Sequence, residues 1–507
     1  MSLNNKMPRH FLAFNIIYRK TMTTGKLHFY ITLLFMATAL ASCDDDNFGT
    51  SPSQTLTFST DTIRLDTLFA TVPSATASFW AYNKSGDGIR CTSVRQERGN
   101  QSGFRVNVDG AYLGPSAGYA LSDIELRKND SMRVFVEATL PQTSTTDPTA
   151  IEDNIVFTLE NGRQQKVNLN AFAWNAQIEH NMHIKRDTVL PGTALPLVIY
   201  GDLEVDKDAT LTIEAGTTIY FHGNAGMNIH GRLVCKGTPE NPVVLRGDRL
   251  DHMFSYLPYD RVSGQWNGIH FFEESYDNII ESADIHSTYD GIVIDSAAVD
   301  HTTLSMHNSI VHNCQGYGIK TTNAVVDITN CQITNTLDDC LFADGGKVDI
   351  NASTLAQFYP FDSQRGAALR ISAVSHPLLS LNCRNSIVTG YADDCFMAVS
   401  DKDSDNANNF LFSNCLMRTP EVQTDDSVKF KHVVYEDVSD TVSCGRHNFV
   451  LVDGDRQQYD FHLREKAAAI GIADKATMPE TDLSGHKRDD APDAGAYEFV
   501  PAKKEDE

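Results

Sequence analysis

Three eight-residue segments decide the fold: Leu304–Val311 (LSMHNSIV), Val326–Ile333 (VDITNCQI) and Val348–Leu355 (VDINASTL). Each begins 22 residues after the previous one. Two further copies follow after insertions, at Leu381–Val388 (LNCRNSIV) and Phe410–Met417 (FLFSNCLM). A fixed period of this length indicates a repeat architecture in which each turn of the chain stacks on the next.

The pattern inside each repeat predicts a short strand followed by a bend. Apolar residues two apart point inward from one strand, because successive side chains alternate between its two sides. An Asn then makes the bend, since it tolerates left-handed backbone angles and bonds neighbouring backbone groups. Stacked turns should place Asn308 below Asn330 in a ladder of amides. The small residue after each bend should point into the core: Ser309, Cys331, Ser353, Ser386 and Cys415.

These repeats resemble the right-handed parallel β-helix of the pectate-lyase-like superfamily. The phrases DATLTIEAGTTIYF (208–221) and WNGIHF (266–271) resemble the first coils of its Bacteroidetes members. The resemblance implies a β-helix over residues 196–450. The phrases at 482–488 and 492–499 resemble the anchor-type tail that closes such helices, which implies a cap over 451–500 and a disordered end at 501–507. The fold hosts lyases, hydrolases, adhesins and structural spikes, so it indicates architecture rather than one activity.

Residues 54–175 have a different pattern. Short runs that alternate apolar and polar residues are separated by Asn- and Gly-containing turns, which predicts an antiparallel sandwich. The order of its phrases resembles Ig-like modules of the abnormal-spindle and major-sperm-protein type. We expect residues 176–195 to be a linker. The predicted fold class is therefore all-β, with an N-terminal Ig-like β-sandwich followed by a right-handed parallel β-helix.

The N-terminal residues predict export. The apolar run at 29–42 is too short to span a bilayer, and Lys26 precedes it, as in a secretory signal peptide. It ends in Leu-Ala-Ser-Cys at residues 40–43, which resembles a bacterial lipobox. This resemblance implies a signal peptide with a lipobox over residues 1–43, whose true start is Met1 or Met22. Cleavage would leave Cys43 as a lipidated N-terminus. Residues 44–53 would then be a linker.

The charged residues also indicate an exported protein. Asp44–Asp46 resemble the acidic signal that exports Bacteroidetes lipoproteins to the outer face of the outer membrane. The formal net charge of −24 argues against a nucleic-acid partner, because phosphate binding needs a basic surface. We therefore expect a lipid-anchored protein, exposed at the cell surface.

Candidate site residues lie in a second repeated phrase, which follows each bend. Alternation predicts that Lys320 and Arg370 point outward. Apolar side chains at the equivalent positions of other coils should also point outward, and aspartates lie beside them. One hypothesis is a lyase in which Lys320 or Arg370 is the base and Asp338 and Asp339 bind Ca²⁺. A second is hydrolysis by paired carboxylates. A third, which we favour, is that the aspartates are turn residues. The apolar outward residues are Val293, Phe342 and Met397, and the aspartates are Asp338, Asp339, Asp393 and Asp394.

Other residues are weaker candidates. His180 and His183 could form part of a metal site, but they fall in the expected linker and no third ligand is visible. Cys331 and Cys415 are predicted core thiols, and Trp266 is predicted to pack in the first full coil. No cofactor is expected, apart from the Ca²⁺ of the lyase hypothesis.

Three functions follow from these features. The first is non-catalytic binding or adhesion, in which the helix face holds a polysaccharide or a surface protein. The second is a polysaccharide lyase or glycoside hydrolase. The third is a structural subunit of an outer-membrane complex, with a membrane barrel as its partner.

Overall fold

The computed structural model describes residues 47–193, 195–401 and 406–501. They form two compact units. One contains the described residues up to Ile63 together with Thr76–Glu137 and Asp153–Leu169, and the other contains Arg64–Ala75, Ala138–Glu152 and the chain from Asn170 onward. Among the described residues, no helix has the length and apolar character needed to cross a membrane. The signal peptide, Cys43 and Asp44–Asp46 lie outside the described residues.

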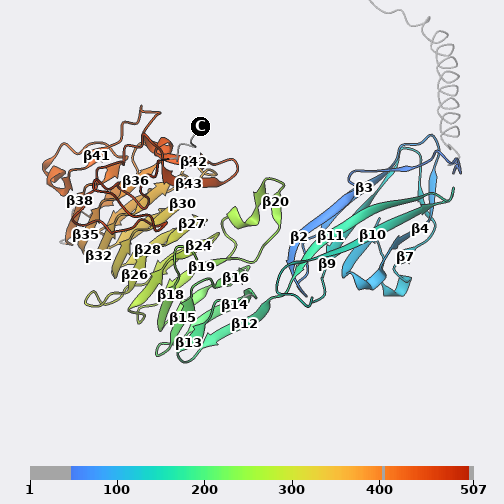
Figure 1. The fold of residues 1–507 in the computed structure, drawn as a ribbon, viewed down its shortest axis with the longest axis horizontal. Coiled ribbons are helices and arrows are strands. Elements are labelled where there is room, and N and C mark those ends of the chain that lie inside the picture. Colours follow the sequence, from blue (N-terminus) through green and yellow to red (C-terminus); the bar gives the residue numbers. More distant parts are fainter. Residues whose placement is uncertain (1–46, 194, 402–405, 502–507) are drawn as a thin grey trace, which may run out of the picture. The chain divides into compact units, whose positions relative to one another are not determined.

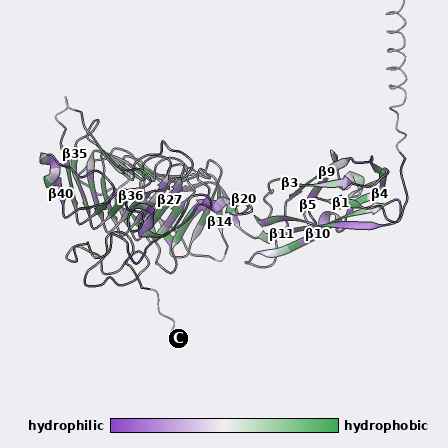
Figure 2. Cartoon of the chain, turned by 90° about the horizontal axis from the view of Figure 1, so that it is seen from above, coloured by the Kyte–Doolittle hydropathy of each residue, from purple (hydrophilic) through white to green (hydrophobic). Residues whose placement is uncertain are grey.

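The N-terminal strands form two antiparallel-paired sheets, as alternation predicted. Phe157 of one sheet packs against Phe58 and Phe79 of the other, with ring centroids 5.0 and 6.5 Å away. Figure 2 shows that these strands contain both hydrophobic and hydrophilic residues. One sheet has the order β1 (Leu56–Phe58), β3 (Ala77–Asn83), β9 (Ser131–Ala138), β5 (Phe104–Val108) and β6 (Ala111–Tyr112). The other has β2 (Thr62–Phe69), β11 (Gln164–Trp174), β10 (Thr149–Leu159), β4 (Ile89–Gln96) and β7 (Ala120–Leu121), with β8 (Ile124–Leu126) beside β4.

The later strands form a parallel coil, in which each strand pairs with its equivalent one turn on (Figure 1). The coil has three faces, which we name A, B and C. Face A contains β13 (Thr188–Leu190), β15 (Thr210–Glu214), β18 (Arg232–Lys236), β23 (Asn278–Glu281), β26 (Leu304–His307), β29 (Val325–Thr329), β32 (Gly346–Asn351), β35 (Leu378–Arg384), β38 (Asn408–Ser413) and β40 (Phe430–Lys431).

Faces B and C belong to one 18-stranded sheet, since β12 (Gln177–Ile184) and β14 (Leu197–Val205) run through both. Face B continues with β16 (Thr218–His222), β19 (Val243–Gly247), β24 (Ala283–His286), β27 (Ile310–Cys314), β30 (Gln332–Thr336), β33 (Thr354–Gln357), β36 (Ile387–Gly390), β39 (Leu416–Met417) and β41 (Val434–Tyr435). Face C continues with β17 (Met227–Ile229), β22 (Ile269–Phe271), β25 (Ile292–Ile294), β28 (Ile319–Thr322), β31 (Leu341–Asp344), β34 (Leu369–Ser372) and β37 (Phe396–Val399).

The sequence repeats stack in register. Leu304 pairs with Val326, and Val326 pairs with Val348, so the 22-residue step is one turn of the coil. The apolar residues of these strands are buried in one continuous core. The small residues after each bend are also fully buried, which confirms the predicted inward positions: Ser309, Cys331, Ser353, Ser386 and Cys415.

The predicted amide ladder is present but interrupted. Asn330 Nδ2 donates to Asn308 Oδ1 at 2.7 Å, and both residues have left-handed backbone angles, with φ of 60° and 49°. Ala352 occupies the next bend with φ of 51°, where a side-chain amide is lacking. The preceding residue replaces it, because Asn385 Nδ2 donates to Asn351 Oδ1 at 3.0 Å.

Residues 176–195 are not a linker. They contain β12 and β13, which pair in parallel with β14 and β15 and so form part of the coil. The expectation was wrong because the outward side chains of β12 are mostly polar, which hides the few inward apolar residues. The coil therefore starts about twenty residues before position 196, where it was expected.

The C-terminal segment lies along the side of the coil. It begins with a hairpin of β42 (Phe449–Asp453) and β43 (Gln458–Leu463) and continues mostly without regular structure. Its apolar residues pack on outward side chains of face B, including Ala356, Ile387 and Leu416. Arg488 Nη2 donates to Asn330 Oδ1 at 2.9 Å, which joins the segment to the amide ladder. We call residues 449–500 the tail.

Short elements complete the described chain. A small hairpin of β20 (His252–Phe254) and β21 (Leu257–Pro258) lies in the insertion between β19 and β22. The 3₁₀ helices are η1 (Gly99–Gln101), η2 (Pro115–Ala117), η3 (Tyr259–Arg261), η4 (Asp425–Lys429) and η5 (Gly445–Asn448).

Candidate functional site

A groove of about 600 Å³ lies over face B. Outward side chains of β24, β27 and β30 line it, together with Asp260 and Arg261 from the insertion and residues 457–462 from the tail hairpin. Three parts of the chain that are far apart in sequence therefore meet at one concave surface.

The composition of face B explains where the groove lies. On β33, β36 and β39 the outward side chains include Ala356, Ile387 and Leu416, and the tail covers them. On β24, β27 and β30 most outward side chains are polar and line the groove: Asp284, His286, His312, Gln332 and Thr334. The tail thus covers the apolar part of face B, and the groove lies over its polar part.

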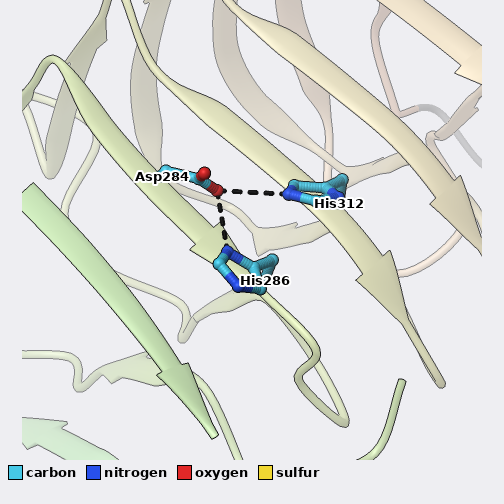
Figure 3. A group of neighbouring side chains, drawn as sticks. All are labelled: Asp284, His286 and His312. Carbon is cyan, nitrogen blue, oxygen red and sulfur yellow. Dashed lines mark hydrogen bonds and ion pairs between the residues drawn. The ribbon is translucent and has the colours of Figure 1, made fainter. Parts of the chain in front are cut away.

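Asp284, His286 and His312 form a compact cluster in the groove (Figure 3). His286 Nδ1 lies 2.9 Å and His312 Nε2 lies 3.2 Å from the same oxygen, Asp284 Oδ1. Asp284 and His286 are two apart on β24, so they share its outward side. His312 on β27 pairs with His286 on β24, and the centroids of their rings lie 4.9 Å apart.

Asp260 extends this cluster. Its Oδ1 lies 3.0 Å from His286 Nε2 and 2.5 Å from Arg246 Nη1. His286 therefore contacts a carboxylate with each ring nitrogen, and the Arg246 guanidinium holds the second carboxylate in place.

Opposite charges set the ionisation of this cluster. Burial alone would raise the pKa of Asp284, but His286 and His312 outweigh it and hold this pKa well below its usual range. Burial likewise acts to raise the pKa of Asp260, and His286 and Arg246 lower it to about 2. Burial acts to lower the pKa of His286, while Asp284 and Asp260 raise it to about 9. At neutral pH the groove therefore holds two carboxylates and an imidazolium.

Amide and aromatic groups line the rest of the groove. Asn335 is 2% exposed, and neither atom of its amide has a hydrogen-bond partner within the protein. Gln457 Nε2 on the tail hairpin is also buried without a partner. The Tyr497 hydroxyl donates to Gln332 Oε1 at 2.8 Å. The centroid of the His462 ring lies 4.1 Å from that of the Tyr497 ring. The groove thus offers polar groups that the chain leaves unsatisfied, beside flat rings.

The residues predicted from sequence lie on face C instead. Lys320 and Arg370 both point outward, as predicted, on strands β28 and β34. Lys320 Nζ lies 5.2 Å from the Tyr317 ring centroid. Arg370 Nε donates to Asp339 Oδ2 at 2.7 Å, and this bond raises the pKa of Arg370. Asp338 lies nearby, and burial raises the pKa of its carboxyl, with further contributions from Asp339.

Three of the four predicted aspartates, Asp339, Asp393 and Asp394, have structural partners. Asp339 is 3% exposed and accepts from the Ala367 backbone N–H at 2.7 Å as well as from Arg370. Asp394 accepts from Thr419 Oγ1 at 2.8 Å, and the exposed Asp393 lies 3.4 Å from Arg418 Nη2. The structure brings Lys320, Arg370, Asp338 and Asp339 to one part of face C, and it places Asp393 and Asp394 near Arg418.

The histidine pair in β12 separates. His180 packs on Tyr200, whereas His183 lies against Glu204 and Asp206 of the next coil. Among the described residues, His183, Glu204 and Asp206 form one of two groups whose potential metal-ligating atoms lie within 4.8 Å of one another. The other group is Asp284, His286 and His312. The buried positions of Trp266, Cys331 and Cys415 agree with the predictions for them.

The groove residues were missed although a signal was present. The repeats align Ile285, Val311 and Ile333 as inward residues. The residues on either side of each must then stack outward, which brings His286 next to His312. The sequence contains no such indication for the tail residues that line the groove. Their contacts join segments that are distant in sequence, and such contacts produce no periodic pattern.

Comparison with known proteins supports the fold. Residues 199–355 match the model of the right handed beta helix region. The match begins within β14 and ends within β33, and it includes β24, β27 and β30 of the groove. Among curated proteins, Protein bark beetle of Drosophila melanogaster is 35% identical over 82 residues. These are 16% of this chain and 3% of that protein, so the chain spans a small part of its length.

Solved structures are only distantly similar. The catalytic unit of a GH87 α-1,3-glucanase from Streptomyces thermodiastaticus aligns with 71% of this chain and 89% of its own, at 9% identity and a TM-score of 0.17. Dex49A from Penicillium minioluteum aligns with 74% and 75%, at 8% identity and a TM-score of 0.15. The VesB protease of Vibrio cholerae aligns with 23% and 31%, at 13% identity and a TM-score of 0.16. Such scores carry no argument about activity.

Proposed function

We propose that this chain is a non-catalytic glycan-binding protein whose groove on face B holds the ligand. One observation carries the proposal: the groove contains buried amide atoms, both of those on Asn335 and Nε2 of Gln457, that have no partner within the protein. Buried polar groups are normally hydrogen-bonded, and leaving one unpaired costs about 1–3 kcal/mol. A hydroxyl-rich ligand could satisfy them, and the His462 ring, whose side chain is 42% exposed, offers a flat surface to a sugar.

The charges in the groove favour binding over hydrolysis. The usual glycosidase pair needs one carboxylic acid that stays protonated near neutral pH, and so has a raised pKa. Asp284 and Asp260 have lowered pKa values and are therefore both ionised. The lyase hypothesis on face C is also weakened, because Arg370 is bound to Asp339 and is a poorer base for it.

The ligand we propose is a neutral polysaccharide. The chain has a formal net charge of −24, which repels polyanions over distances of about a Debye length, roughly 8–10 Å at moderate salt. We further propose that a lipid on Cys43 anchors the protein at the outer membrane with both units exposed. Replacing Cys43 by Ala should move the protein from the membrane fraction to the soluble fraction, and retention in the membrane would contradict the anchor.

The binding proposal is tested by affinity electrophoresis of the full chain, purified in detergent, through gels that contain single polysaccharides. We expect retention by at least one neutral polysaccharide. Asn335→Gly removes the unpaired amide but suits the positive φ of 58° at this position, and it should weaken retention about tenfold, the equivalent of 1.4 kcal/mol. Phe342→Ala, on face C, is the matched control and should leave retention unchanged.

Two results would contradict the proposal. Equal retention of wild-type and Asn335→Gly protein, with a loss in Phe342→Ala, would place the ligand on face C. Shortening of a polysaccharide during the same incubation would show that the protein is an enzyme.

A further inference from the structure

The cluster in the groove has the composition of a metal site as well as of an ion-pair network. Asp284, His286 and His312 each offer one ligand atom, and these atoms lie within 4.8 Å of one another. Two imidazoles and a carboxylate form a ligand set that suits zinc and other divalent first-row transition metals. Calcium and magnesium prefer oxygen ligands, so this set selects against them.

The fold holds these three ligands in place. Asp284 and His286 lie on β24, and His312 lies beside them on β27 in parallel register. All three side chains point to the same side of the sheet, with both rings directed at the Asp284 carboxylate (Figure 3). A site on adjacent strands of a packed coil needs little rearrangement to bind an ion.

A second set of residues supports the ligands. His286 Nδ1 faces Asp284, and its Nε2 lies 3.0 Å from Asp260 Oδ1. Metal-ligating histidines typically bond a carboxylate through the nitrogen that does not bind the metal, which fixes the ring and increases its basicity. Arg246 in turn holds Asp260, with Nη1 2.5 Å from Oδ1.

A further observation points to a ligand at this surface. Asn335 lines the same groove, is 2% exposed, and has two amide atoms without a partner in the protein. The three potential ligands would occupy one side of an ion, so its remaining coordination positions would be open to whatever the groove holds.

We propose that Asp284, His286 and His312 bind one divalent transition metal ion of the zinc class, with Asp260 as the positioning residue for His286. This site does not depend on glycan binding. Its test uses the metal alone, so failure of either proposal can be recognised separately.

The experiment starts from the full chain in detergent, stripped of metal with a chelator and then desalted. Titration with Zn²⁺ is followed by calorimetry, and the zinc retained after a second desalting is measured by mass spectrometry. We expect wild-type protein to retain one equivalent at this site. His312→Ala should lose it, with affinity at least about 100-fold lower, and Asp260→Asn should weaken binding about 10- to 100-fold. Co²⁺ in place of Zn²⁺ should give a visible absorption band that His312→Ala lacks.

The second ligand group provides the control. His183, Glu204 and Asp206 are partly exposed, and His183→Ala should leave the retained zinc and the cobalt spectrum unchanged. Circular dichroism verifies that each variant is folded, and His286→Gln replaces His312→Ala if the latter is not. The proposal is overturned if wild-type protein retains no zinc, if His312→Ala or His286→Gln binds it as tightly as wild type, or if only His183→Ala loses it.

Discussion

Arg488 and Asn330 lie 158 residues apart in sequence, and yet Arg488 Nη2 is 2.9 Å from Asn330 Oδ1. Asn330 is a step of the coil's amide ladder, and its Nδ2 also donates to the backbone oxygen of Thr481 at 2.9 Å. The same side chain therefore makes a bend of the coil and docks the tail that forms one wall of the groove.

We predict that Asn330→Ala releases the tail. The substitution removes the bonds to Asn308, Thr481 and Arg488, and it places alanine at a left-handed φ of 60°. About 1 kcal/mol for each of the three bonds and about 1 kcal/mol for the backbone give a loss of roughly 4 kcal/mol in the free energy of unfolding. Urea unfolding should record this loss, and hydrogen exchange should become faster over residues 477–498.

Asn323→Ala is the matched control, since Asn323 also has a left-handed backbone, with φ of 41°, and its amide bonds Ser296 rather than the tail. Faster tail exchange in both variants would mean that the bend, and not the docking contact, controls the tail.

We predict that Arg370→Ala destabilises the coil. Asp339 is 3% exposed, and without Arg370 its buried carboxylate loses a charged partner at 2.7 Å. The expected cost is about 2 kcal/mol, whereas Lys320→Ala on the same face should cost less than about 0.5 kcal/mol. Urea denaturation midpoints measure both. If Arg370→Ala is as stable as wild type, Asp339 does not need this partner, and Arg370 becomes available for other roles.

We predict that the described cysteines resist alkylation in the native protein. All are buried and form no disulfide. Burial raises the pKa of Cys235, Cys314 and Cys331 to about 12, so these thiols stay protonated and unreactive as pH rises from 8 to 10. Iodoacetamide followed by mass spectrometry should modify them only after unfolding in guanidinium. Native labelling that increases with pH would show that the core opens.

Much of the coil could be predicted from sequence because its physics is local and periodic. The 22-residue repeat correctly predicted which residues point inward. The Asn at the bends also predicted the left-handed backbone seen at Asn308 and Asn330. The start of the coil was placed too late, since β12 carries polar outward residues and lacks the repeated phrase. The Ig-like character of the N-terminal sandwich remains a prediction.

The candidate site was harder to predict. Lys320 and Arg370 were correctly assigned to an outward stripe, but alternation alone does not show which of three faces becomes concave. That depends on the insertion that carries Asp260 and on the tail hairpin, and both reach the groove through contacts between segments distant in sequence. The polar part of face B can be recognised as a candidate site only when it is known that the tail covers the apolar part beside it.

The most direct test of the groove is hydrogen exchange of the full chain with and without the polysaccharide that retains it most strongly. We predict slower exchange in residues 332–336 of β30 and 457–462 of the tail hairpin, the segments that line the groove. We also predict no change in residues 317–322 and 341–344 of face C. Protection confined to those face C segments would contradict the account and return the candidate site to the stripe around Lys320 and Arg370.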